Sequence, residues 1–122
     1  MTGHALIKRR RRKARAAHTA WDALAASPHD LGTGPLVTPG QGRIGISHSA
    51  GLAAGTVTVT HITGRREFTH PALAADEMHK GDHVERGARV TVSGAPTGTL
   101  TLWAINTLDS GRSRAIATLV VA

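Results

Sequence analysis

The side chains of this sequence with the clearest chemistry are seven cations within eight positions near the N-terminus. They are Lys8, Arg9, Arg10, Arg11, Arg12, Lys13 and Arg15. A guanidinium grips phosphate or carboxylate with two parallel hydrogen bonds, so the cluster suits nucleic acid, anionic headgroups or an acidic protein groove. The later residues hold eight basic and eight acidic side chains. The formal charge of +7 therefore belongs entirely to this segment.

The chain has eight histidines, and two of them have a spacing known from metal sites. His79 and His83 are four residues apart, as in a helical zinc site. However, Lys80-Gly81-Asp82 favours a turn over a helix, the glutamate of the zinc-protease motif is missing, and the chain has no cysteine. We therefore expect hydrogen-bonded or exposed histidines, with no metal site and no cofactor.

No pattern in the sequence marks a catalytic centre. There is no nucleophile elbow, no phosphate-binding loop of the Walker type and no dinucleotide-binding glycine motif. Asp76 and Glu77 are adjacent carboxylates, which usually point in different directions, and we expect them to cap a turn. The prediction is that the protein is not an enzyme and has no catalytic residues.

The elements that position these residues divide the 122-residue chain into three parts. Residues 1–27 form a basic N-terminal arm, partly helical and partly extended, because 5–26 lack proline and internal glycine and hold many Ala and Arg. Trp21 is the one large apolar residue of the arm, and we group it with the seven cations as partner-binding. Ser27-Pro28 should end the helix. Residues 28–42 are rich in Gly and Pro and predict a linker.

Residues 43–122 alternate Thr and Val in short runs between glycines, which is typical of strands. The fold predicted is mainly β, a small antiparallel β-sandwich or barrel of about six or seven strands. A helical turn is expected at 71–78. The expected strands are 43–49, 55–63, 65–70, 84–93, 99–107 and 114–121.

Trp103 and Ile105 are candidates for a subunit interface. If Leu100, Leu102 and Ala104 face the core, strand alternation puts Trp103 and Ile105 on the opposite face. Either the N-terminal helix covers that face through Trp21, or another subunit does. The sequence leaves both alternatives open.

The location of the protein follows from what the sequence lacks. No apolar run approaches the ~20 residues of a membrane span, and no apolar stretch follows the cations as in a secretory signal. Cysteine, which would form the disulfides of small secreted domains, is absent. The expectation is a cytoplasmic protein without membrane contact.

Residues 81–105, GDHVERGARVTVSGAPTGTLTLWAI, within a cysteine-free β-domain behind a basic arm, resemble small virion structural proteins of tailed bacteriophages. These include capsid decoration (cement) proteins and head–tail or tail components. The resemblance implies a non-enzymatic protein of the virion, assembled in the cytoplasm of the bacterial host. It also implies a homo-oligomer, such as a trimer or ring, whose arm ties it to coat or other virion proteins. Deleting 1–27 should then leave a folded β-domain that is not incorporated.

Two other functions remain open. The first is a nucleic-acid-binding protein, in which the arm makes nonspecific DNA contacts and the β-domain is an oligomerisation platform. Base-specific recognition is disfavoured because stacking aromatics are scarce in the arm and the predicted strands. The second is a carbohydrate-binding β-module, against which the same scarcity of aromatics counts.

Overall fold

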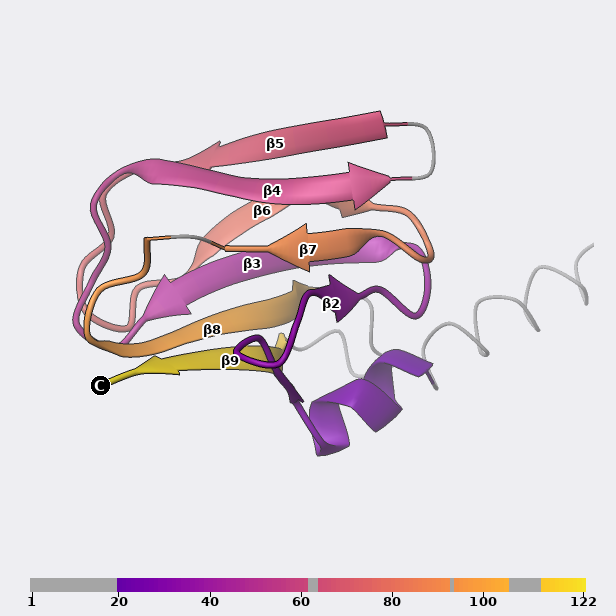
Figure 1. Ribbon diagram of the computed structural model, residues 1–122, viewed down its shortest axis with the longest axis horizontal. Helices are drawn as coiled ribbons and strands as arrows, with labels where there is room; N and C mark the ends of the chain where they lie inside the picture. Colours follow the sequence, from indigo (N-terminus) through magenta and orange to yellow (C-terminus); the bar gives the residue numbers. More distant parts are fainter. Residues whose placement is uncertain (1–19, 62–63, 93, 106–112) are drawn as a thin grey trace, which may run out of the picture.

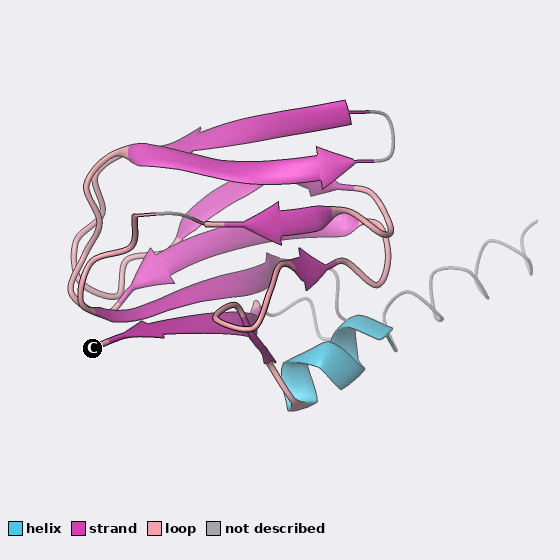
Figure 2. Cartoon of the chain, viewed as in Figure 1, coloured by secondary structure: helices cyan, strands magenta, loops and turns pink. Residues whose placement is uncertain are grey.

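The computed structural model describes residues 20–61, 64–92, 94–105 and 113–122. Within these ranges the chain is mainly β, with nine strands and one short helix at 20–26 (Figures 1 and 2). The predicted mainly β class is confirmed. The strand number exceeds the prediction because residues 28–42 contribute two short strands and residues 79–84, which include the predicted turn, form a third.

The strands form two sheets, which we call the first and the second sheet. The first has the order β1 (His29–Asp30), β9 (Arg114–Val121), β8 (Gly98–Ile105), β3 (Gly42–His48) and β6 (His79–Val84). The second has the order β2 (Leu36–Val37), β7 (Arg89–Thr91), β4 (Gly55–His61) and β5 (Gly64–His70). Neighbouring strands are antiparallel except for β1 and β9, which are parallel.

One hydrophobic core joins the two sheets. Strand alternation brings Ile44 and Ile46 of β3 to the same side as Leu100 and Leu102 of β8, and all four are fully buried. Val90 of β7, a strand of the second sheet, belongs to the same cluster. The inward face of β8 is thus the predicted one.

The helix at 20–26 is attached to this core by Trp21. Its side chain is fully buried within the core cluster, and its indole Nε1 donates to the carbonyl oxygen of Gln41 at 3.3 Å. Leu24, one turn later, packs against the cluster. The helix ends just before Ser27-Pro28, as predicted. Trp21 is therefore a core residue, which corrects its assignment to the partner-binding surface of the arm.

Residues 28–42, predicted as a linker, belong to the folded domain. They contain β1 and β2, and Leu36 is buried opposite Val90 of β7. The hydroxyl of Thr38, also buried, accepts a hydrogen bond from the backbone N–H of Ala88 at 2.9 Å. Glycine and proline here shape short edge strands, and the segment adds β1 to the edge of the first sheet and β2 to the edge of the second.

The segment Lys80-Gly81-Asp82, predicted as a turn, lies inside β6. Its glycine serves close packing, since an added Cβ at Gly81 would lie 2.6 Å from the Phe68 ring and 2.7 Å from the Ile44 carbonyl oxygen. The chain turns later instead, at Gly87, whose φ is 77°. That turn separates β6 from β7 and divides the predicted strand at 84–93.

The helical turn expected at 71–78 is a tight non-helical turn. The Glu77 N–H donates to the Ala74 carbonyl oxygen at 3.1 Å, and the Glu77 carboxylate accepts from the Ala74 N–H at 3.2 Å. Glu77 thus caps the turn, as expected for the acidic pair. The backbone of Asp76, within the turn, is in the left-handed region, with a φ of 61°.

Candidate functional site

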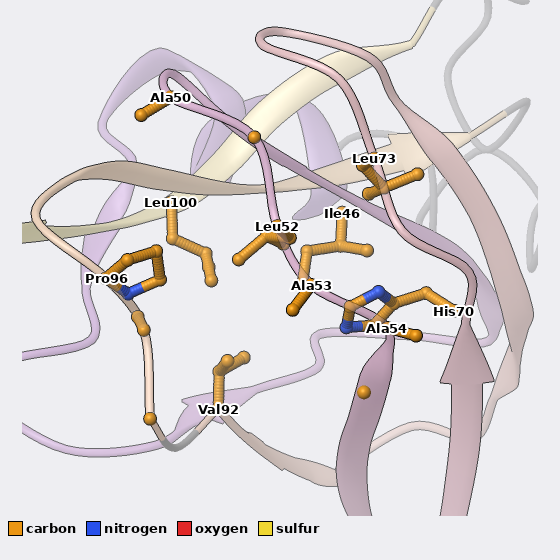
Figure 3. A pocket seen from close by; sticks show the side chains of 14 residues that line it. Ile46, Ala50, Leu52, Ala53, Ala54, His70, Leu73, Val92, Pro96 and Leu100 are labelled. Atoms are coloured by element: carbon orange, nitrogen blue, oxygen red, sulfur yellow. The ribbon is translucent and has the colours of Figure 1, made fainter.

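The β3–β4, β5–β6 and β7–β8 connections lie at the same end of the two sheets (Figure 1). A cavity of about 610 Å³ opens among them (Figure 3). Its walls come from both sheets and from these three connections. Ile46 and Leu100 line it from the first sheet, and His70 from the second. The other lining residues are mostly small or aliphatic: Ala50, Gly51, Leu52, Ala53, Ala54, Gly55, Leu73, Val92, Gly94, Ala95 and Pro96. Cavities of this size and character are typical of small-molecule sites.

His70, the last residue of β5, is the one titratable side chain in the cavity wall. It is 7% exposed, and its ring extends into the space shown in Figure 3. Nδ1 lies 3.0 Å from the carbonyl oxygen of Pro71, which only accepts, so Nδ1 carries the hydrogen. In the neutral ring Nε2 is then an acceptor, and within the described part of the chain no group donates to it.

His48, at the end of β3, holds the connections around the cavity together. Its Nδ1 accepts from the Ala50 N–H at 3.0 Å, so in the neutral ring Nε2 donates to the Pro96 carbonyl oxygen at 3.1 Å. Its own carbonyl oxygen accepts from the N–H of Asp76 at 2.8 Å. His48 thus binds residues of all three connections, and it is 1% exposed. We infer a positioning role for it.

Sequence reasoning did not single out either histidine, although the strand pattern contains a signal for both. His48 follows Ile44 and Ile46 at intervals of two, so it shares their inward face. His70 follows Phe68 in the same way. A histidine at an inward position is buried and needs hydrogen-bond partners, which distinguishes these two from exposed ones such as His83.

The structure distinguishes Trp103 from Ile105, the two proposed interface residues. Ile105 is 1% exposed and lies over Gly45 together with Met78, so residues of the same chain cover it. Trp103 is half-buried, and its Nε1 donates to the Ser47 hydroxyl at 2.8 Å. The side chains of Ile105 and Met78 thus meet at Gly45, and Trp21 lies in a core cluster without Ile105.

Of the remaining predicted residues, the cations of the arm are not among the described residues, whereas the two histidines with metal-like spacing are. Lys8, Arg9, Arg10, Arg11, Arg12, Lys13 and Arg15 lie outside the described residues. His79 and His83 lie on β6, where both pair with β3. Over the described ranges, no three His, Cys, Asp or Glu side chains gather as a metal site requires. The same ranges contain no helix with the length and apolar character of a membrane span.

The cavity is a site that can bind but shows no arrangement for bond making. It offers apolar walls, backbone groups from three connections and one buried acceptor, but no nucleophile beside a base among its lining residues. No protein family, curated protein or solved structure matches this chain. Its function is therefore inferred from its own residues.

Proposed function

We propose that this protein is a non-enzymatic structural component of a tailed-phage virion, a small β-sandwich that decorates or joins the particle and is tied to it by its basic arm. The observation that carries the proposal is the separation of charge. All of the formal +7 lies in residues 8–15, whereas the positive and negative side chains after Arg15 are equal in number. A neutral domain with one cationic segment suits attachment to an acidic partner through that segment.

The buried Trp21 supports a tethering role. The basic residues end only a few positions before a side chain that is completely inside the core. A weak surface contact joins the same helix to the first sheet, because Asp22 and Arg114 approach to 3.8 Å. A partner that held the arm would therefore hold the domain core directly.

One edge of the first sheet supports the self-association that a ring or trimer requires, and the other edge does not. Lys80 and Asp82 on β6 are exposed, and charged edges of this kind resist pairing with other strands. β9 differs, because its last three residues, Leu119–Val121, are uncharged and Val120 is 71% exposed. β1 pairs only with Ala117 and Thr118 of β9. Beyond them, the β1 side of β9 has no strand partner among the described residues, so a second copy could pair there.

A nucleic-acid-binding protein is the second candidate, and the density of the arm favours it. Neutralising seven phosphate contacts predicts a log–log salt slope of about −6 for duplex DNA. Binding of a 30-base-pair duplex would be measured from low to physiological salt. The proteins compared are the full chain, a chain of residues 20–122, and a full-length control with all seven cations changed to Gln. The truncation starts at residue 20 because the 1–27 deletion would also remove the buried Trp21.

On the virion proposal, DNA binding by the full chain is weaker than about 100 µM near physiological salt. Particles purified from the tailed phage that carries this gene contain the full chain, and both variants are excluded from them although they fold. Micromolar DNA binding with the steep slope, lost in both variants, would replace the proposal with the nucleic-acid function. Normal incorporation of the variants would refute the tether.

A further inference from the structure

We propose that the cavity at the end of the core binds a small, largely apolar molecule with one hydrogen-bond-donating group, such as a phenol or alcohol, whose donor contacts Nε2 of His70. This function is separate from particle assembly. It rests on the cavity and on the buried acceptor described above, not on the arm.

The size and lining of the cavity set the body of the ligand. A volume of about 610 Å³ lies within the range of roughly 300–1,000 Å³ that small-molecule pockets occupy. Ile46, Leu52, Leu73, Val92 and Leu100 supply aliphatic side chains, and no charged residue lines the cavity apart from the ionisable His70. A charged ligand would lose its hydration there without gaining an opposite charge, so the body of the ligand is neutral and apolar.

The hydrogen bond from His70 Nδ1 to the Pro71 carbonyl determines which polar group the ligand carries. It fixes the hydrogen on Nδ1 and, in the neutral ring, leaves Nε2 as an acceptor, so the complementary group is a donor. A buried polar atom without a partner costs free energy, which a donating ligand would recover. Carbonyl compounds and ethers have no donor and would not recover it.

Gly55 keeps the approach to Nε2 open. A Cβ added at this position would lie 3.2 Å from Nε2 and 3.5 Å from Cε1 of His70. Any side chain at residue 55 would therefore crowd the side of the ring that the ligand donor must reach. The glycine thus supplies a second variant that tests the same contact without altering the histidine.

The test compares two probes with the same apolar body, 4-propylphenol and its methyl ether, 4-propylanisole. Both are titrated into the ¹⁵N-labelled full chain, and binding is followed by NMR. We expect the phenol to bind about threefold to tenfold more tightly than the ether, which is the effect of one net hydrogen bond. The amide signals that shift should belong to residues 50–55 and 94–95, around the cavity.

His70→Phe keeps a ring in the cavity wall but removes the acceptor, so the preference for the phenol should disappear. Gly55→Ala should reduce the same preference by crowding Nε2. The matched control is His83→Phe, the same change at an exposed histidine outside the cavity, and it should leave the preference intact. The proposal is overturned by equal affinities in the unmodified protein, by a preference that survives His70→Phe, by shifts elsewhere, or by no binding of either probe.

Discussion

Replacing Trp21 by alanine tests whether the helix at 20–26 is part of the core. A fully buried tryptophan removes about 150–250 Å² from water, which corresponds to about 4–6 kcal/mol at about 25 cal/mol per Å². Measured losses for Trp→Ala in protein cores are about 3–5 kcal/mol. The change also removes the hydrogen bond from the indole to the Gln41 carbonyl oxygen, about 1 kcal/mol. We expect a free energy of unfolding lower by about 3–5 kcal/mol, a large part of the stability of a small domain.

The assay is urea unfolding followed by far-ultraviolet circular dichroism, which does not depend on tryptophan as a reporter. Trp21→Phe keeps an aromatic ring but loses the donor, and should cost about 1–2 kcal/mol. The control is Val37→Ala, at a side chain that is 55% exposed, with an expected change below about 0.5 kcal/mol. A loss below about 1 kcal/mol for Trp21→Ala, with an unchanged urea dependence, would show that the tryptophan does not anchor the helix.

Two further predictions concern close contacts in the core. Gly45→Ala would place a Cβ 2.6 Å from Ile105 Cδ1 and 2.8 Å from the His79 carbonyl oxygen, so unfolding should become easier by about 1–3 kcal/mol; an unchanged thermal midpoint would contradict this packing. Thr38→Val keeps the shape of the side chain but removes the hydroxyl that accepts from the Ala88 N–H and donates to the Glu85 carbonyl oxygen. The Ala88 N–H then keeps only its longer contact with that carbonyl oxygen, at 3.3 Å, and the change should cost about 1–3 kcal/mol in urea unfolding. Thr38→Ser, which retains the hydroxyl, should cost less, and equal losses for the two variants would contradict the hydrogen-bond argument.

The strands that the sequence predicted well are those whose alternation extends over a whole element. Residues 114–121 were predicted as a strand and form β9 with the same bounds, and the inward side of β8 follows from the same rule. The segment at 28–42 could not be predicted in this way. Its Gly and Pro describe local backbone preferences, whereas its burial depends on Leu36 meeting Val90, which is more than fifty residues away.

In the candidate site too, features set by local strand alternation were predictable, and features set by contacts between distant segments were not. Strand alternation places His48 and His70 inward, so their burial is readable from the sequence. The cavity itself is not, because three connections far apart in the chain form it and the tautomer of His70 depends on the path of the backbone at Pro71. Small residues such as Ala53 and Gly55 have no chemical signature in a sequence, yet they determine how much space remains.

The folding of residues 28–42 into the domain limits how far the basic segment extends from it. With that stretch folded, only residues 16–19 separate the last cation of the segment from the described part of the chain. A chain spans at most about 3.5 Å per residue, so Lys8 lies within about 42 Å of Ala20, and Arg15 within about 18 Å. Short tethers of this kind give a high local concentration at nearby sites and none at distant ones. On the virion proposal, the site that the arm binds must therefore adjoin the surface on which the domain rests, and changes in spacing between those two surfaces would control occupancy.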